Sequence, residues 1–169
     1  MRLDADVCRS RFAAARHAYL ATADGDGVPQ LVPVTFALVS TAVGGQTPAG
    51  GSPASDGPGG TQESTSTGAP ADEVVVAVDH KPKTTLNLKR LRNIAENPRV
   101  ALLADRYDDD WTHLWWVRAD GVAVVEHDGA PRAAALDALA DRYPQYRERR
   151  PDGPVIRVRV ARWSGWAHG

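Results

Sequence analysis

Cysteine is almost absent from this chain of 169 residues, and no stretch of it is both long and apolar. The single cysteine, Cys8, has no partner for an internal disulfide. A lone cysteine is more often a packing residue near a helix than a catalytic nucleophile. No apolar run approaches the ~20 residues that a transmembrane helix requires. The first residues, MRLDADVCRSRF, also lack the apolar core of a signal peptide. We therefore predict a cytoplasmic protein with no membrane partner.

A strong net charge is missing as well. The formal net charge is −1 at pH 7, which argues against a nucleic-acid partner, because nucleic-acid-binding domains are usually strongly basic. The sequence contains no GxGxxG, GxxxxGKS/T, HExxH or GxSxG motif. These absences argue against classical dinucleotide, P-loop and α/β-hydrolase chemistry.

Nothing in the sequence has the spacing of a metal site. The chain has five histidines, at His17, His80, His113, His127 and His168, and none of them forms a close pair of the kind that binds zinc. Three consecutive aspartates follow Tyr107, but neighbouring loop residues rarely converge on one ion. We predict no metal.

Lysine is rare and concentrated. All three lysines of the chain (Lys81, Lys83 and Lys89) lie within nine residues, and Arg90 and Arg92 follow at once. A strand that leads through such a segment into a helix brings cations and backbone N–H groups together, which favours binding of a phosphate or carboxylate. The alternative is a basic helix that simply faces solvent.

Hydrophobic periodicity predicts a mainly β protein. Strands are expected at 18–22, 30–39, 73–80, 99–105, twice within 113–128 around a turn at Ala119-Asp120-Gly121, and at the C-terminal end; helices are expected at 4–17, 84–96 and 129–148. The first helix has Asp4 or Asp6 as its cap and Val7, Phe12 and Ala15 on its buried face. Thr84 or Thr85 caps the second, and Pro144 interrupts the third. Hairpin connections favour a small antiparallel barrel over a doubly wound parallel sheet.

The segment 40–72 has a different composition from the rest of the chain. It is dominated by Gly, Ser, Thr, Pro and Ala and contains no aromatic residue. Such a segment cannot bury enough apolar surface to offset its loss of conformational entropy. We predict a disordered insertion in a hairpin connection, within a single domain that spans 1–169.

Two tryptophans are neighbours in a predicted strand. Trp115 and Trp116 must point to opposite faces of the sheet. One of them is expected in the core and the other against a ring-shaped ligand or a subunit interface. Plain core packing is the alternative for either tryptophan.

Three motifs in the same order resemble the pyridoxamine-5'-phosphate-oxidase-like split β-barrel superfamily. They are Ala21-Thr22 through Asp26-Gly27-Val28-Pro29 to Pro33-Val34-Thr35-Phe36, Lys89-Arg90-Leu91-Arg92-Asn93 to Asn97-Pro98-Arg99-Val100, and Val117-Arg118-Ala119-Asp120-Gly121. More narrowly, DHKPKTT, LRNIAENPRV and DDDWTHLWWVRADG are similar to probable actinobacterial enzymes that use the deazaflavin coenzyme F-420. The resemblance implies a homodimeric, Greek-key split barrel with a flavin-type cofactor in each of two interfacial clefts.

The same resemblance implies roles for individual residues. Lys89 and Arg90 occupy the position of the phosphate-binding pair, and Lys81 and Lys83 are additional cations of the narrower group. Thr35 occupies a position that lines the cofactor ring. Trp116 replaces a glutamine that contacts the cofactor in flavin-binding relatives.

The implied function is hydride transfer between the cofactor and a small conjugated substrate, with the chemistry supplied by the cofactor. The implied cofactor is F-420, with FMN as the alternative. No side chain is identified as catalytic. A non-enzymatic protein that binds a cofactor or haem, or a purely structural dimer, remains as a competing hypothesis.

Overall fold

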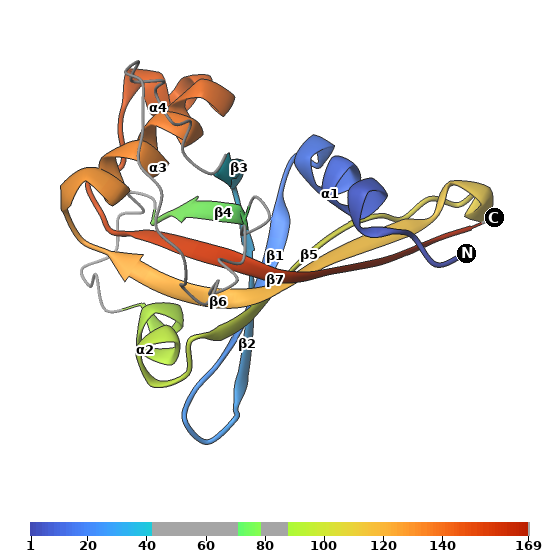
Figure 1. The fold of residues 1–169 in the computed structure, drawn as a ribbon, viewed down its shortest axis with the longest axis horizontal. Helices are drawn as coiled ribbons and strands as arrows, with labels where there is room; N and C mark the ends of the chain where they lie inside the picture. The colour runs from blue at the N-terminus through green and yellow to red at the C-terminus, as the bar shows by residue number, and fades with distance from the viewer. Residues whose placement is uncertain (42–70, 79–87, 169) are drawn as a thin grey trace, which may run out of the picture.

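The computed structural model describes residues 1–41, 71–78 and 88–168, and the described parts form one antiparallel sheet with helices around it (Figure 1). The strands are β1 (Ala18–Ala23), β2 (Pro29–Val34), β3 (Ala37–Thr41), β4 (Ala71–Ala77), β5 (Arg99–Arg106), β6 (Trp115–Glu126) and β7 (Val155–Ala167). The helices are α1 (Ala5–Ala14), α2 (Lys89–Glu96), α3 (Gly129–Arg142) and α4 (Pro144–Glu148), with a short 3-10 turn, η1, at Trp111–His113.

The seven strands follow the order β2-β1-β5-β6-β7-β4-β3, and all of their pairings are antiparallel. The two edge strands, β2 and β3, are consecutive in the chain and are separated only by Thr35 and Phe36. This short link returns the chain from one edge of the sheet to the other, so the sheet closes on itself at that corner. The predicted antiparallel split β-barrel is confirmed.

Alternating side chains give the sheet an inner face that forms the main core. Leu20, Leu102, Val117 and Ile156 are fully buried there. Helix α1 covers this core with Phe12, whose ring centroid lies 4.5 Å from that of Phe36. A second cluster forms where Leu136 and Leu139 of α3 pack on the other side of the sheet, against β3, β4 and β7.

Helix α1 begins one residue after its predicted cap. The Asp4 carboxylate accepts a hydrogen bond from the Val7 N–H at 2.8 Å, which confirms Asp4 as the cap. The prediction that Val7 is buried is wrong, because its side chain is exposed; Cys8 and Phe12 are the residues that face the core. Burial raises the pKa of the Cys8 thiol, an effect to which the Asp4 carboxylate adds. Cys8 is a packing residue, as expected.

The strand predicted at 30–39 is in fact two strands, β2 and β3. Tyr143 separates them, because its hydroxyl accepts a hydrogen bond from the Phe36 N–H at 3.1 Å and donates one to the Phe36 carbonyl at 2.9 Å. Both backbone groups of Phe36 are thereby satisfied without a neighbouring strand.

The turn predicted at Ala119-Asp120-Gly121 is also wrong. Strand β6 runs continuously through these residues and pairs with β7, with a bulge beside Asp120 and Gly121. A Cβ atom on Gly121 would lie 2.4 Å from the Arg159 carbonyl oxygen. The glycine therefore marks a close approach of two strands and not a reversal of the chain.

The remaining boundaries differ in smaller ways. Helix α2 begins at Lys89, and its cap is Leu88 in place of the predicted Thr84 or Thr85; residues 84–87 lie outside the described residues. Pro144 does separate α3 from α4, as predicted. Ser40 pairs with Asp72 in the β3–β4 ladder, so the strands extend into both ends of the low-complexity segment, while 42–70 lie outside the described residues. No helix in the described ranges is both long and apolar enough to cross a lipid bilayer.

Candidate functional site

The basic turn of α2 is the first part of the candidate site. Lys89 and Arg90 are its first two residues; Lys89 is exposed and Arg90 is half-buried. The preceding residue is Leu88, whose side chain cannot accept a hydrogen bond from the first N–H groups, and the first turn contains no acidic residue. A helix N-terminus of this kind carries partial positive charge together with the two side-chain charges. It fits a phosphate group.

This turn is held on the barrel by the C-terminal half of α2. Ile94 is buried in the main core, and the Asn93 side-chain amide donates a buried hydrogen bond to Thr22 Oγ1 at 3.0 Å. Glu96 accepts a hydrogen bond from the Gly25 N–H at 2.9 Å, which joins the helix to the β1–β2 turn. Both contacts fix the position of the basic residues relative to β1.

Trp116 lies on the outer face of the sheet, near the start of β6. Its neighbour Trp115 packs toward the main core, so the prediction that the two rings face opposite sides is confirmed. Trp116 is 38% exposed and stands directly opposite Trp166 of β7, which is 37% exposed. Arg2 pairs with Trp166 from the other side. One row therefore runs from Asp105 of β5 through the two indole rings of β6 and β7 to the bridge residue Arg2.

The next rows of the same face are polar. Arg118 stands opposite Ser164, and Asp120 stands opposite Arg162. The Asp120 carboxylate accepts hydrogen bonds from Arg118 at 3.1 Å and from Arg162 at 2.9 Å. Trp116 and Trp166, together with Arg118, Arg162 and Ser164 of these rows, line a hollow of about 590 Å³, whereas Asp120 faces the neighbouring hollow. That volume lies within the range of small-molecule sites.

The middle of the outer face is apolar. A second hollow, of about 500 Å³, is lined largely by Ala21, Ala23, Pro29, Ala101 and Val122. Leu31, opposite Ala21 on β2, is 63% exposed. An apolar sheet surface of this extent is typical of a contact with another molecule.

Thr35 lies at the β2–β3 corner and not on this face. Its hydroxyl and that of Tyr146 in α4 share a hydrogen bond of 2.8 Å. Arg142 reinforces the corner by placing its guanidinium 4.4 Å from the centroid of the Phe36 ring. Thr35 is therefore fixed by a structural contact, and its assignment to the cofactor ring stays a prediction.

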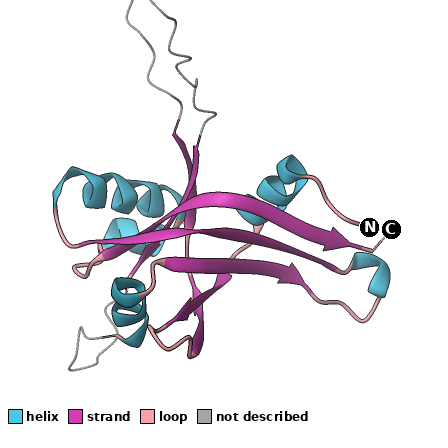
Figure 2. Cartoon of the chain, turned by 60° about the horizontal axis from the view of Figure 1, so that its bottom comes forward, coloured by secondary structure: helices cyan, strands magenta, loops and turns pink. Residues whose placement is uncertain are grey.

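The structure brings together only some of the predicted site residues. Lys89 and Arg90 are adjacent in α2, which lies beside the C-terminal half of β6 (Figure 1), whereas Trp116 is the second residue of that strand and follows η1 closely in the chain. Figure 2 shows the long strands with helices at both of their ends. Lys81 and Lys83 lie outside the described residues. The sequence provided no reason to assign a binding role to Arg118 or Arg162, and Trp166 stood out only as one of five tryptophans. The alternation of Arg162, Ser164 and Trp166 was visible, but their register with β6 was not.

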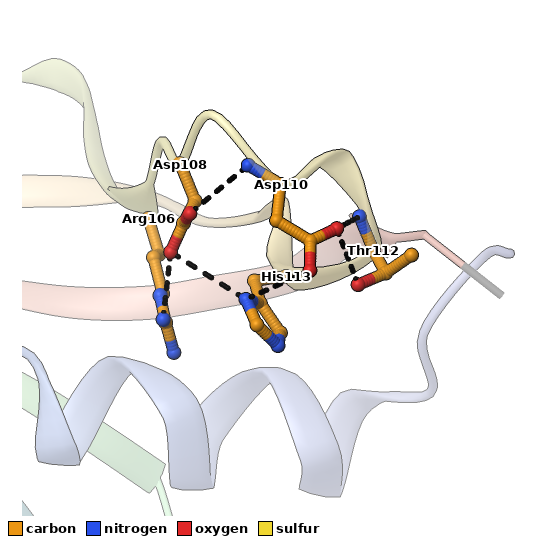
Figure 3. A network of polar contacts seen from close by, with 5 residues as sticks. All are labelled: Arg106, Asp108, Asp110, Thr112 and His113. Carbon is orange, nitrogen blue, oxygen red and sulfur yellow. Dashed lines mark hydrogen bonds and ion pairs between the residues drawn. The ribbon is translucent and has the colours of Figure 1, made fainter.

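Two of the aspartates that follow β5 accept hydrogen bonds from residues of the same loop (Figure 3). Asp108 accepts a hydrogen bond from Arg106 at 2.7 Å, and Asp110 accepts hydrogen bonds from the Thr112 hydroxyl at 2.7 Å and the Thr112 N–H at 3.0 Å. These bonds, from Arg106 and Thr112 respectively, hold the pKa of each carboxyl below its ordinary value of 3.8. In the part of the chain that the structure describes, no group of three His, Cys, Asp or Glu is placed to hold a metal ion.

The closed corner, the single antiparallel sheet and the basic helix define a split β-barrel. Residues 73–167 match the pyridoxamine 5'-phosphate oxidase family, and the chain belongs to this family. No curated protein matches the chain.

Several solved structures share the fold. An FAD-binding protein from Mesorhizobium loti is 19% identical with a TM-score of 0.61, over 98% of this chain and 95% of the other. An FAD-binding protein from Mycobacterium smegmatis is 16% identical with a TM-score of 0.54, over 98% of each chain. The haem storage protein HutZ from Vibrio cholerae is 16% identical with a TM-score of 0.57, over 100% of this chain and 96% of the other. The predicted superfamily is confirmed.

Proposed function

We propose that this protein is a cytoplasmic, homodimeric oxidoreductase that binds a flavin-type cofactor and transfers a hydride to or from a small conjugated substrate. The proposed cofactor is the deazaflavin F-420, with FMN as the alternative. The observation that carries the proposal is the doubly charged first turn of α2, formed by Lys89 and Arg90, whose N-cap residue Leu88 provides no side-chain hydrogen bond. Membership of the pyridoxamine 5'-phosphate oxidase family and the FAD-binding proteins of the same fold support a flavin-type ligand.

The residues present fit the two chemical parts of such a cofactor. Lys89 and Arg90 would hold its phosphate, and Lys81 and Lys83 would add positive charge nearby. Trp116 offers an exposed indole on the outer face, which suits a flat conjugated ring. The resemblance assigns Thr35 to the ring as well, although Thr35 lies at the β2–β3 corner and not on the outer face. The cofactor supplies the hydride chemistry, while the protein supplies position and electrostatics.

The preference for F-420 rests on Trp116. Where flavin-binding relatives carry a glutamine that hydrogen-bonds the cofactor, this chain presents a bulky apolar ring. An indole can stack on a conjugated system but cannot reproduce both hydrogen-bonding groups of an amide. This difference favours a deazaflavin over FMN.

The apolar middle of the outer face supports the homodimer. Leu31, the alanines of the apolar hollow and Val122 lie on one continuous sheet surface. A second copy of the chain is the partner we propose for it, because a self-complementary sheet face forms a closed two-fold contact. The cofactor sites would then lie at the margins of that contact.

Titration of the protein with F-420 and with FMN, followed by tryptophan fluorescence, tests the function. We expect tight binding of F-420 and weaker binding of FMN. The double substitution Lys89→Ala with Arg90→Ala should weaken cofactor binding by several kcal/mol, because each charge-assisted contact contributes roughly 1.5–3 kcal/mol. Arg92→Ala, which removes an exposed charge from the same helix, is the matched control.

The outcomes separate the competing functions. Preference for FMN would indicate an FMN-dependent oxidase or reductase. Tight binding of a cofactor or haem without turnover with any electron acceptor would indicate a storage or carrier protein. HutZ, which shares the fold, is described as a haem storage protein. Binding of none of these ligands would exclude the cofactor hypothesis and leave a structural dimer. Unchanged affinity in the double variant would show that the phosphate is held elsewhere.

A further inference from the structure

The hollow beside Trp116 differs in chemistry from the phosphate turn of α2. It combines two exposed indole rings with three arginines, and none of the described residues that line it is a carboxylate. Asp120, which pairs with Arg118 and Arg162, lines the neighbouring apolar hollow. Trp116 and Trp166 stand side by side because their strands pair in register. Their rings provide an apolar, aromatic surface of the kind on which flat ligands lie.

The arginines leave the hollow with excess positive charge. Asp120 lies between Arg118 and Arg162 and accepts hydrogen bonds from both, so one carboxylate faces two guanidinium groups. Arg2 makes no ion pair with any described residue and adds a third positive charge at the edge of the hollow. The side chain of Arg162 is 67% exposed, so its guanidinium group can contact a ligand without any change in the backbone of β7.

One polar atom of the hollow has no protein partner. Ser164 Oγ is shielded from solvent but forms no hydrogen bond with any described residue. It lies on the same face as Arg162 and opposite Arg118. Buried hydroxyl groups are normally satisfied, and a ligand oxygen would satisfy this one if the neighbouring arginine side chains turned toward the ligand.

We infer that this hollow recognises a planar conjugated anion, such as an aromatic carboxylate or phosphate ester. The ring would lie against Trp116 and Trp166, and the anionic group would be bound by Arg118, Arg162 and the Ser164 hydroxyl. This inference rests on the proposed function, for which it names the substrate class. A substrate held there would lie next to the cofactor ring that is assigned to Trp116.

Substitution of Asp120 distinguishes ligand binding from a purely structural role, because Asp120 competes with a bound anion for Arg118 and Arg162. If Arg118 and Arg162 serve anion recognition, Asp120→Asn should strengthen ligand binding and Arg162→Gln should weaken it. If the three residues serve only the stability of the β6–β7 ladder, the two substitutions should have effects of the same sign. Arg159→Gln removes an exposed positive charge from the same strand and face, outside the hollow, and is the matched control.

The experiment is a titration of the cofactor-free protein with 4-nitrobenzoate and with neutral 4-nitrobenzamide, followed by quenching of tryptophan fluorescence and by calorimetry. We expect the anion to bind at least ~10-fold more tightly than the amide, since a charge-assisted hydrogen bond adds over 1.4 kcal/mol. Arg162→Gln should weaken binding of the anion ~10-fold, Asp120→Asn should strengthen it, and Arg159→Gln should leave it within about twofold. Equal affinity for the two probes, or weaker binding in both Arg162→Gln and Asp120→Asn, would overturn the inference.

The two proposals fail separately. Because the titration contains no cofactor, Lys89→Ala with Arg90→Ala should retain the affinity of the wild-type protein for 4-nitrobenzoate. Loss of 4-nitrobenzoate selectivity with intact cofactor binding would overturn only the substrate class. Intact selectivity without any cofactor binding would overturn the proposed function and support the hollow as an anion site.

Discussion

The hydroxyl groups of Thr35 and Tyr146, 111 residues apart in the chain, share a hydrogen bond of 2.8 Å. Next to it, the Tyr143 hydroxyl bonds with both backbone groups of Phe36. The two tyrosines lie at the α3–α4 junction, which is thereby fastened to the corner where the barrel closes (Figure 1). These bonds make the C-terminal helices part of the closure.

The two tyrosine contacts should differ in their contribution to stability. Tyr143→Phe leaves the Phe36 N–H and carbonyl without their partner, and we expect a loss of about 1–3 kcal/mol in the free energy of unfolding. Tyr146→Phe removes the bond to the hydroxyl of Thr35, a side chain that is only partly buried, and should cost about 0.5–1.5 kcal/mol. Urea unfolding measures both values. Tyr107→Phe, at a side chain that is 85% exposed, is the control. A larger loss in Tyr146→Phe than in Tyr143→Phe would contradict this ranking.

Gly121→Ala should destabilise the sheet strongly. The added Cβ would lie 2.4 Å from the Arg159 carbonyl oxygen, and a backbone atom cannot move without disrupting the β6–β7 ladder. We expect a loss of about 2 kcal/mol or more. Gly25→Ala is the control, since its nearest neighbour would be the Glu96 carboxylate at 3.5 Å. Thermal unfolding compares the two variants, and equal melting temperatures would show that the bulge accommodates a side chain.

The acid titration of Asp110 should depend on Thr112. The folded pKa of Asp110 lies below 3.8, first because of the hydrogen bond from the Thr112 hydroxyl. The folded carboxylate therefore binds a proton less readily than the unfolded one, so its contribution to stability is present above pH 3.8 and is lost as the pH falls through the folded pKa.

Carboxyl carbon chemical shifts measured by NMR test this dependence. Thr112→Val should raise the pKa of Asp110 toward 3.8 and leave that of Asp108 depressed, because Arg106 is the main cause there. A pKa of Asp110 that does not respond to Thr112→Val would show that the hydroxyl has no part in the effect.

Leu31→Glu should break the proposed homodimer. The substitution places a carboxylate in the apolar middle of the outer face, where Leu31 is 63% exposed in the single chain. A charge buried without a partner in an interface is strongly unfavourable, so we expect monomers at concentrations where the wild type is dimeric. Sedimentation velocity measures this. Val28→Glu, in the β1–β2 connection and 50% exposed, should leave the dimer intact. A wild-type monomer, or a dimer that tolerates Leu31→Glu, would refute the proposed interface.

Local chemistry in the sequence was enough to predict most elements of the fold. The Asp4 cap, the break at Pro144 and the antiparallel strands follow from side-chain geometry within a few residues of each site. The same holds for the opposite orientation of Trp115 and Trp116, because alternation along a strand needs no knowledge of its neighbours. The concentration of lysine favours an anion site at the segment that leads into α2, which stays a prediction.

Tertiary structure decided the features that depend on pairing over long distances. Phe36 leaves the strand because Tyr143 satisfies its backbone, and Gly121 continues the strand because Arg159 lies against it. The register between β6 and β7 places Arg162 beside Asp120 and Trp166 beside Trp116. A shift of one residue would turn those side chains to the other face of the sheet. The sequence by itself thus determined which segments become strands and helices, while the packing of distant strands determined which side chains meet on the outer face.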